Sequence, residues 1–358
     1  MKLFQVIEEL VEEKGLERSV LSSIICEGML AAYSKRYPEL HFQVDYDKKT
    51  DEISINVQKK VVASVTDDDT EISHRKAKNI NPSLNVDDTI WVPFEGKIGR
   101  IEILRAKQVI ANQIRHIEAE AIFNEFKDKK DTIVHGVVHK CERNGANIKI
   151  DDALAFLPKS LTIPGEKCNV GFSIRVLLKD VLTEPRNDNQ LILDRVSTLF
   201  IEKLFELEIP EVFEKLVEIK RVVRIPGYKS KVAVISNDSN IDPVGTCVGV
   251  GGVRIKPILK ELGTEKIDII SWNESLEHFI KDALKPAIIN RVELVDNKNA
   301  NIFLEEDQRS LAIGKMGQNI SLASQLTGVN IHLVQSSSQR LDLNEERQQD
   351  YSGLDDLN

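Results

Sequence analysis

The chain has 358 residues, of which 41% are hydrophobic and 29% are charged, and its formal net charge is −9. This composition indicates a soluble globular protein of about two to four domains. No run approaches the roughly 18 apolar residues of a membrane-spanning helix, and the N-terminus lacks the pattern of a signal peptide. We therefore expect a cytoplasmic protein without membrane contact.

The first part of the chain mixes helical and β-type patterns. Its expected elements are helices over 3–13, 16–35 and 101–126, a hairpin over 41–65 and a strand over 89–94. A charged run follows the long helix, so we expect an N-terminal domain over residues 1–130 that includes this connecting helix. Asp67-Asp68-Asp69 predicts the start of a short helix over 71–78, with a Mg²⁺ site as the alternative.

Residues 131–198 contain short β-type runs separated by polar or glycine turns. Several short strands of this kind are typical of small closed β-barrels. We therefore expect a Greek-key barrel of the OB type. The expected strands cover 133–138, 146–150, 153–157, 174–178 and 191–193.

The cysteines are scattered along the chain without a C-x-x-C pair, which indicates reduced thiols in a cytosol. They are Cys26, Cys141, Cys168 and Cys247. His135, His139 and Cys141 share one face of an expected strand and could suggest a metal. Their spacing matches no usual zinc pattern, so an ordinary strand surface is favoured and no metal site is assigned.

The same pattern occurs twice over residues 199–274 and 275–335, which is typical of one supersecondary unit used twice. Each copy has the expected order α-β-β-α-loop-α-β. The loops are Gly249-Val250-Gly251-Gly252 and Gly314-Lys315-Met316-Gly317. A G-x-x-G loop between two helices is the signature of the KH module, in which it clamps about four backbone nucleotides.

The loop chemistry fits a phosphate backbone. Glycine allows close approach and positive φ, and the free N–H groups of the following helix favour an anion. We expect RNA contacts from both loops, from Arg254, and from Gln318 and Asn319. The alternative is a purely structural helix–helix corner.

No segment is broadly basic, so RNA binding must use local cations. The hairpin over 217–236 offers five, with a solvated hairpin as the alternative: Lys220, Arg221, Arg224, Lys229 and Lys231. Tyr228 is one candidate for base stacking. Ile255, Ile269 and Ile320 could line an apolar groove, although a core role is favoured for each.

We find no Walker loop, no G-x-G-x-x-G fingerprint and no catalytic constellation, so no cofactor and no catalytic residue are expected. Two function classes remain open. One, which the family resemblance given next implies, is a transcription regulator that binds RNA and polymerase without turnover. The other is an RNA-processing or ribosome-associated RNA-binding protein.

The motifs resemble those of the NusA family of bacterial transcription factors. In the first copy these are Phe205-Glu-Leu-Glu-Ile-Pro-Glu211, Asp242-Pro-Val-Gly-Thr-Cys-Val-Gly249 and Glu261 to Ile269. In the second copy they are Ala312 to Asn319 and Leu322-Ala323, and in the barrel Leu157-Pro158 and Ile163-Pro-Gly-Glu166. The resemblance covers nearly the whole chain to about residue 335.

The resemblance implies an α+β multidomain protein. Its parts are a helical/β N-terminal domain that contacts RNA polymerase, an OB-fold RNA-binding barrel, two tandem type II KH domains and an acidic disordered tail over 336–358. It implies a monomer that binds nascent single-stranded RNA and modulates pausing, termination and antitermination, with other antitermination factors as further partners.

This chain departs from the family pattern at three places. The first loop usually carries a basic residue where Val250 and Gly251 stand, so Arg254 is expected to matter more. The closing barrel strand usually reads L-S-R and here reads Leu193-Asp194-Arg195. Phe172 stands where a charged residue is common.

Overall fold

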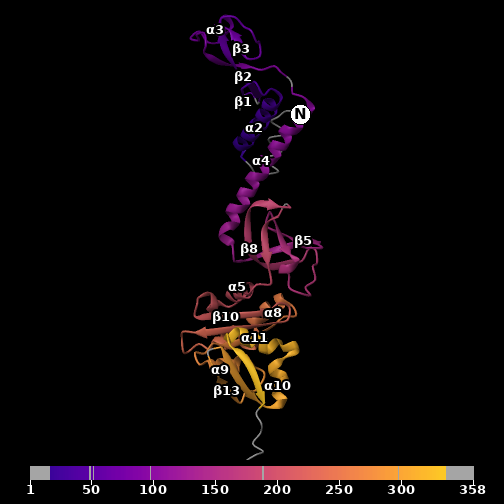
Figure 1. Ribbon diagram of the computed structural model, residues 1–358, viewed down its shortest axis with the longest axis vertical. Coiled ribbons are helices and arrows are strands. Elements are labelled where there is room, and N and C mark those ends of the chain that lie inside the picture. The colour runs from indigo at the N-terminus through magenta and orange to yellow at the C-terminus, as the bar shows by residue number, and fades with distance from the viewer. Residues whose placement is uncertain are drawn as a thin grey trace, which may run out of the picture. The chain divides into compact units, whose positions relative to one another are not determined.

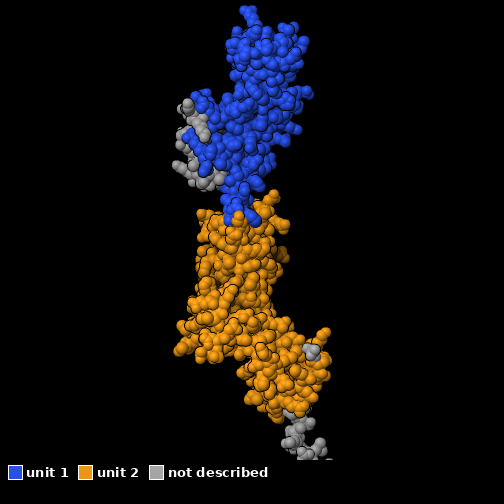
Figure 2. Space-filling view, turned by 90° about the vertical axis from the view of Figure 1, so that its left-hand side faces the viewer, with its two compact units in different colours: residues 1–124 blue, residues 125–358 orange. Residues whose placement is uncertain are grey.

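The computed structural model describes residues 17–335 except 48, 49, 51, 97, 188 and 297. The chain divides into two compact units, residues 1–124 and residues 125–358 (Figure 2). The expected helix over 3–13 and the expected tail over 336–358 lie outside the described residues. None of the described helices is long and apolar enough to cross a membrane.

The first unit has two apolar clusters. One lies between its two long helices, and the other, rich in aromatic rings, joins the earlier of these helices to a small sheet. In its sheet, β2 pairs with β1, β3 and β4. Phe94 lies edge-on to Phe42 and Tyr37, which closes the core at the end of the sheet. The elements are α2 (Arg18–Arg36), β1 (Phe42–Asp47), β2 (Glu52–Val62), β3 (Glu71–Ser73), α3 (His74–Ile80), β4 (Thr89–Pro93) and α4 (Arg100–Phe126).

The expected second helix, hairpin, strand and long helix of this unit are confirmed. The expected helix start at Asp67 is wrong. The Asp67 carboxylate instead accepts hydrogen bonds from Asp69 N and the Thr70 hydroxyl, forming a turn that precedes a strand. The helix begins later, where the Ser73 hydroxyl accepts a hydrogen bond from Lys76 N.

The second unit begins with a closed barrel in the strand order β5-β6-β7-β9-β8. Side chains alternate inward and outward along β6 and β7, which fills the barrel with small and branched residues. The five expected strands are confirmed, and their assignment to the OB type stays a prediction. They are β5 (Ile133–Glu142), β6 (Gly145–Ile150), β7 (Ala153–Pro158), β8 (Ser173–Arg186) and β9 (Asn189–Asp194).

The expectation of four reduced thiols is wrong for this barrel. Cys141 near the end of β5 forms a disulfide with Cys168, 27 positions later. The pairing could not be read from the spacing, because only the closure of the barrel brings the two residues together. Cys26 and Cys247 are free.

Two KH-type units follow the barrel, and the expected order of elements is confirmed in both (Figure 1). In each three-stranded sheet the first pair is antiparallel and the second is parallel. The first unit has α5 (Thr198–Glu208), α6 (Pro210–Phe213), β10 (Val217–Ile225), β11 (Lys229–Ser236), α7 (Pro243–Val248), α8 (Ile255–Leu262) and β12 (Lys266–Ser271). The second has α9 (Leu276–Ala283), β13 (Arg291–Leu294), β14 (Asn299–Leu304), α10 (Glu306–Ile313), α11 (Gln318–Thr327) and β15 (Asn330–Gln335).

The first sheet is buried on both faces, which joins the two KH units into one body. Along β11, Val232 and Val234 belong to the core of the first unit, whereas Ala233 between them packs into the core of the second. This alternation follows the two-residue period of a strand. Helices α9 and α11 therefore cover the face of the first sheet that its own helices leave open.

Gly28 lets α2 approach α4 within the first unit, since a Cβ there would lie 2.4 Å from Ile110 Cγ1. We expect Gly28→Val to lower the free energy of unfolding of this unit by about 2–3 kcal/mol, through overpacking. Trp91 lies in the first unit and Trp272 in the second, so Trp91 fluorescence in a Trp272→Phe background reports this transition. The exposed Ser34→Val on the same helix is the control, and equal midpoints for both variants would contradict the packing argument.

Candidate nucleic-acid interface

The two G-x-x-G loops have the same backbone conformation. Gly249 has φ 72° and ψ 163°, and Gly314 has φ 71° and ψ 178°. The third position is left-handed in both loops, at Gly251 with φ 62° and at Met316 with φ 54°. Two loops of different sequence therefore present their N–H groups in the same arrangement.

The loop tips are open to solvent. Val250 is 95% exposed and Met316 is 87% exposed, although both side chains are large and apolar. A Cβ added at Gly251 or Gly317 would meet nothing within 4 Å. A sugar-phosphate backbone can therefore reach the loop backbone from outside.

The first glycine of each loop has a different role, since it faces the protein. A Cβ at Gly249 would lie 3.0 Å from Arg254 Cγ, and one at Gly314 would lie 2.7 Å from Asn319 Cβ. Arg254 and Asn319 occupy the same position after their loops. Each loop thus bends closely around one polar side chain.

The side chains of Arg254 and Asn319 stabilise the two loops through hydrogen bonds. The Arg254 guanidinium donates hydrogen bonds to Thr246 O and to Glu211 Oε1, both at 2.8 Å. The buried Asn319 amide donates to Leu311 O at 3.2 Å and Ala312 O at 3.3 Å, at the end of α10. Both residues were expected to contact RNA. The structure instead directs their polar groups into the fold, to the helix before the loop and to Glu211 of α6 or Leu284 O after α9.

Lys315 and Gln318 complete the second loop. The Lys315 side chain is exposed, and no ion pair of it occurs within the described part of the chain. Gln318 is half-buried, and its Oε1 has no hydrogen-bond partner among the described residues. A cation is therefore available beside the loop backbone, whereas the amide oxygen of Gln318 is buried.

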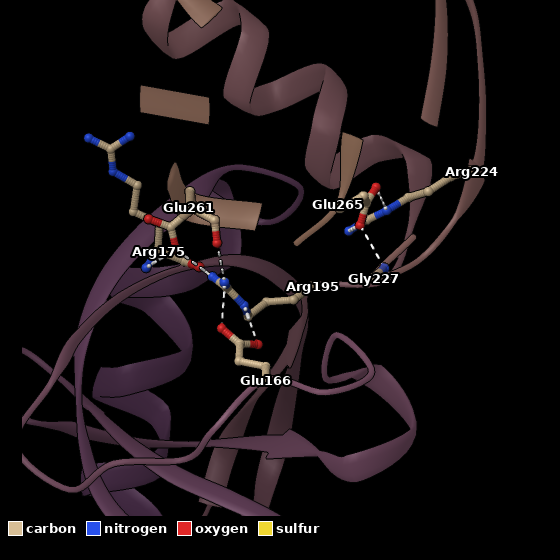
Figure 3. Close-up of polar contacts among 7 residues, drawn as sticks. All are labelled: Glu166, Arg175, Arg195, Arg224, Gly227, Glu261 and Glu265. Atoms are coloured by element: carbon tan, nitrogen blue, oxygen red, sulfur yellow. Dashed lines mark hydrogen bonds and ion pairs between the residues drawn. The ribbon is translucent and has the colours of Figure 1, made fainter. Parts of the chain in front are cut away.

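The structure pairs most of the hairpin cations with carboxylates, and it removes Arg224 and Lys231 from the expected basic surface by burying them. Arg224 is 1% exposed and pairs through two hydrogen bonds of 2.8 Å with Glu265, which also accepts from Gly227 N (Figure 3). Lys231 is fully buried and pairs with Asp268. Burial lowers the pKa of the Lys231 ammonium, while the Asp268 carboxylate opposes this shift.

The other three hairpin cations also have partners. Lys229 pairs with Asp268 at 2.6 Å, and the exposed Lys220 pairs with Glu218 at 2.8 Å. Arg221 donates to Leu326 O at the end of α11 and so links the two KH units. Most of the hairpin charges are therefore used within the fold, whereas Lys220 and Arg221 are exposed and their contact with RNA stays a prediction.

A buried arginine joins the barrel to the first KH unit. Arg195 is 1% exposed and makes a two-hydrogen-bond pair with Glu166 of the barrel, at 2.7 and 3.1 Å (Figure 3). It also pairs with Glu261 of α8 at 2.6 Å and donates to Arg175 O. Arg175 in turn pairs with Glu208. Sequence reasoning quoted Arg195, Glu166 and Glu261 in three separate motifs and missed that they pair.

Of the three isoleucines expected either to line an apolar groove or to lie in the core, two belong to cores and one also lines a groove. Ile255 is buried in the core of the first unit, and Ile320 packs against the core of the second. Ile269 also lines a groove of about 630 Å³ between the two KH units, together with Val244 and Pro286. Tyr228 stays a candidate for base stacking.

The metal hypotheses have no support from the geometry of the described residues. Cys141 Sγ is committed to the disulfide, and Asp67 to its turn. No cluster of three or more potential ligands occurs in the described part of the chain.

Duplicated, exposed G-x-x-G loops on a shared core define a tandem KH protein, a class that binds RNA. Residues 2–120 match the model of the NusA N-terminal domain. Residues 195–272 and 276–341 match the models of the NusA-like first and second KH domains.

Curated relatives extend this match over nearly the whole chain. The transcription termination/antitermination protein NusA of Rickettsia conorii is 35% identical, over 97% of this chain and 70% of the relative. That of Thermus thermophilus is 34% identical over 94% and 91% of the two chains, and that of Bacillus subtilis is 32% identical over 95% and 92%. The chain belongs to the NusA family.

The Arg224–Glu265 pair tests whether the hairpin charges are structural. We expect Glu265→Gln to lower the free energy of unfolding by about 3–5 kcal/mol, because it leaves a buried guanidinium without a counter-charge. Glu218→Gln breaks the exposed pair with Lys220 in the same hairpin and should cost less than about 1 kcal/mol. Denaturant titration followed by Trp272 fluorescence measures both, and similar losses would contradict this assignment.

Cys247 in α7 supplies a test by pH. Burial raises the pKa of its thiol to about 12, with the Glu211 carboxylate as the next cause, against an ordinary value of 9.0. Between pH 9 and about 12 the unfolded chain loses this proton while the folded chain keeps it, so the free energy of unfolding should fall as pH rises. The fall should be smaller in Cys247→Ala, measured by denaturant titration from pH 8 to 10.5. Equal slopes for the two proteins would contradict it.

Proposed function

We propose that this chain is an RNA-binding transcription factor that binds nascent single-stranded RNA and RNA polymerase, and thereby modulates pausing, termination and antitermination without catalysis. The observation that carries the proposal is the pair of exposed loops with matching backbones on one double KH body. The names of its relatives support the transcriptional role.

We assign the two proposed contacts to different parts of the chain, because the N-terminal unit and the KH domains are separate. We assign polymerase contact to the N-terminal domain, residues 1–130, and RNA contact to the KH domains over 199–274 and 275–335. The barrel over 131–198 is assigned an accessory RNA contact. With the hairpin cations paired, the loops supply mainly backbone N–H groups and Lys315, so RNA affinity should be modest.

Charge reversal at the loops tests the RNA contact. Val250→Asp with Lys315→Asp places a carboxylate at each second loop position and leaves the left-handed third positions unchanged. We expect RNA affinity to fall about tenfold or more through repulsion of phosphates, with unchanged stability because both side chains are exposed. Fluorescence anisotropy with a labelled single-stranded RNA measures it.

Val295→Asp is the matched control, because Val295 is an exposed valine of the second KH unit outside both loops. Its RNA affinity should stay within about twofold of the unmodified protein. An unchanged affinity of the folded double variant would refute the loop assignment.

Bivalent attachment makes a kinetic prediction. Polymerase binding places the KH loops at a high local RNA concentration, so a modest RNA affinity is sufficient. The full chain should lengthen a hairpin-dependent pause, and the double loop variant should need about tenfold more protein for the same effect. Pause lifetimes measured on one template over a range of protein concentrations test this prediction, with Val295→Asp as the control. Identical concentration dependence of the loop variant, or no effect of the full chain, would overturn the mechanism.

A further inference from the structure

The Cys141–Cys168 pair fastens an irregular loop to the barrel. Cys141 lies near the end of β5, and Cys168 lies in the connection from the short 3₁₀ turn Lys159–Leu161 to β8. That connection, residues 162–172, has no helix or strand. The disulfide joins its middle to the barrel wall, with the Cα atoms 6.1 Å apart.

Both cysteines are exposed, and their surroundings are positively charged. Arg143, Lys159 and Lys167 line a hollow of about 320 Å³ next to Cys168. Their side chains form no hydrogen bond or ion pair within the described residues, whereas the nearby carboxylates do: Glu142 pairs with Lys140, and Glu166 pairs with Arg195. Exposure and positive charge favour the thiolate, the form of cysteine that reacts.

We propose that Cys141 and Cys168 form a reversible thiol–disulfide exchange site, and that its redox state controls how firmly residues 162–172 are held on the barrel. The proposal rests on the proposed function, because RNA synthesis takes place in a reducing compartment. A disulfide there is more often transient than structural, and an exposed pair is the more labile kind.

The exchange needs a low-molecular-weight disulfide such as glutathione disulfide as oxidant. One cysteine thiolate attacks it, forms a mixed disulfide and releases one glutathione thiolate. The second cysteine thiolate then attacks the protein sulfur of the mixed disulfide and releases the second. Two protein thiols thus lose two electrons and two protons, and one glutathione disulfide becomes two thiols. Excess glutathione reverses both steps.

Loss of the disulfide would loosen the loop without unfolding the barrel. The Glu166–Arg195 pair holds the loop before Cys168, and hydrogen bonds of Val138 to Gly171 and Phe172 hold it afterwards. The freed segment therefore lies around Lys167, next to the exposed ring of Phe172. Cations and aromatic faces are the groups that bind the backbone and the bases of single-stranded nucleic acid. Holding Lys167 and Phe172 in place before RNA binds lowers the entropy lost on binding.

The chemistry is tested on the full chain by counting reactive thiols in denaturant. After equilibration with glutathione disulfide we expect two thiols per chain, and after excess glutathione under native conditions we expect four. Cys141→Ser should reduce the difference to at most one thiol, held as a mixed disulfide with glutathione, and Cys26→Ser should keep the difference of two. A pair that never closes, or that resists glutathione in the folded protein, would overturn the proposal.

The proposed effect of the disulfide on residues 162–172 is tested by hydrogen exchange and by RNA binding. Amides of residues 162–172 should exchange more slowly in the oxidised form, and labelled single-stranded RNA should bind it about threefold more tightly. Cys141→Ser should show one affinity in both buffers. Equal exchange and equal affinity in the two states would overturn the control of the loop. RNA binding by the KH loops would persist in both states, so this failure differs from failure of the proposed function.

Discussion

The buried guanidinium of Arg195 is the constraint on which the second unit depends. A cation with 1% exposure is tolerated only when its charge and its N–H donors are satisfied. Glu166 comes from the barrel and Glu261 from α8, so the N–H donors of the buried guanidinium are all satisfied only when both parts are in place. The barrel and the first KH unit must therefore stay together. Since α8 begins just after the first G-x-x-G loop, the same pairs also fix that loop relative to the barrel.

Internal pairing also determines how RNA can be held. Arg224 and Lys231 are used against Glu265 and Asp268, and Arg254 is used against Glu211. Cations held in this way add little to counterion release on RNA binding. What remains at the loops is backbone geometry, which does not depend on the local sequence. Met316 shows this directly, because it adopts the left-handed conformation that Gly251 adopts in the first loop, at a cost of about 1–2 kcal/mol.

Features set by neighbours in the chain could be predicted from the sequence, and features set by distant partners could not. The doubled α-β-β-α-loop-α-β order and the five barrel strands were predicted from local spacing and turn residues. Arg224 and Lys231 were misread as surface cations because their acids lie in distant elements, with Glu265 41 positions from Arg224. The two cysteines of the barrel are likewise separated by 27 positions. A run of like charges therefore identifies a basic surface only if no acid from another element folds against it.

A modest RNA affinity suits a factor that must follow a growing transcript. Each nucleotide added by polymerase moves the RNA past the protein, so a contact that held one phosphate register tightly would have to break repeatedly against a large barrier. Backbone N–H groups and one exposed lysine in a matched pair of loops recognise the sugar-phosphate chain with little dependence on bulk charge. Attachment to polymerase through the other unit, as proposed, would supply the missing affinity as local concentration. The rigid frame built by Arg195 and the shared KH core then has a physical purpose, because two loops held at a fixed spacing lose less entropy on binding one strand than two loops that move independently.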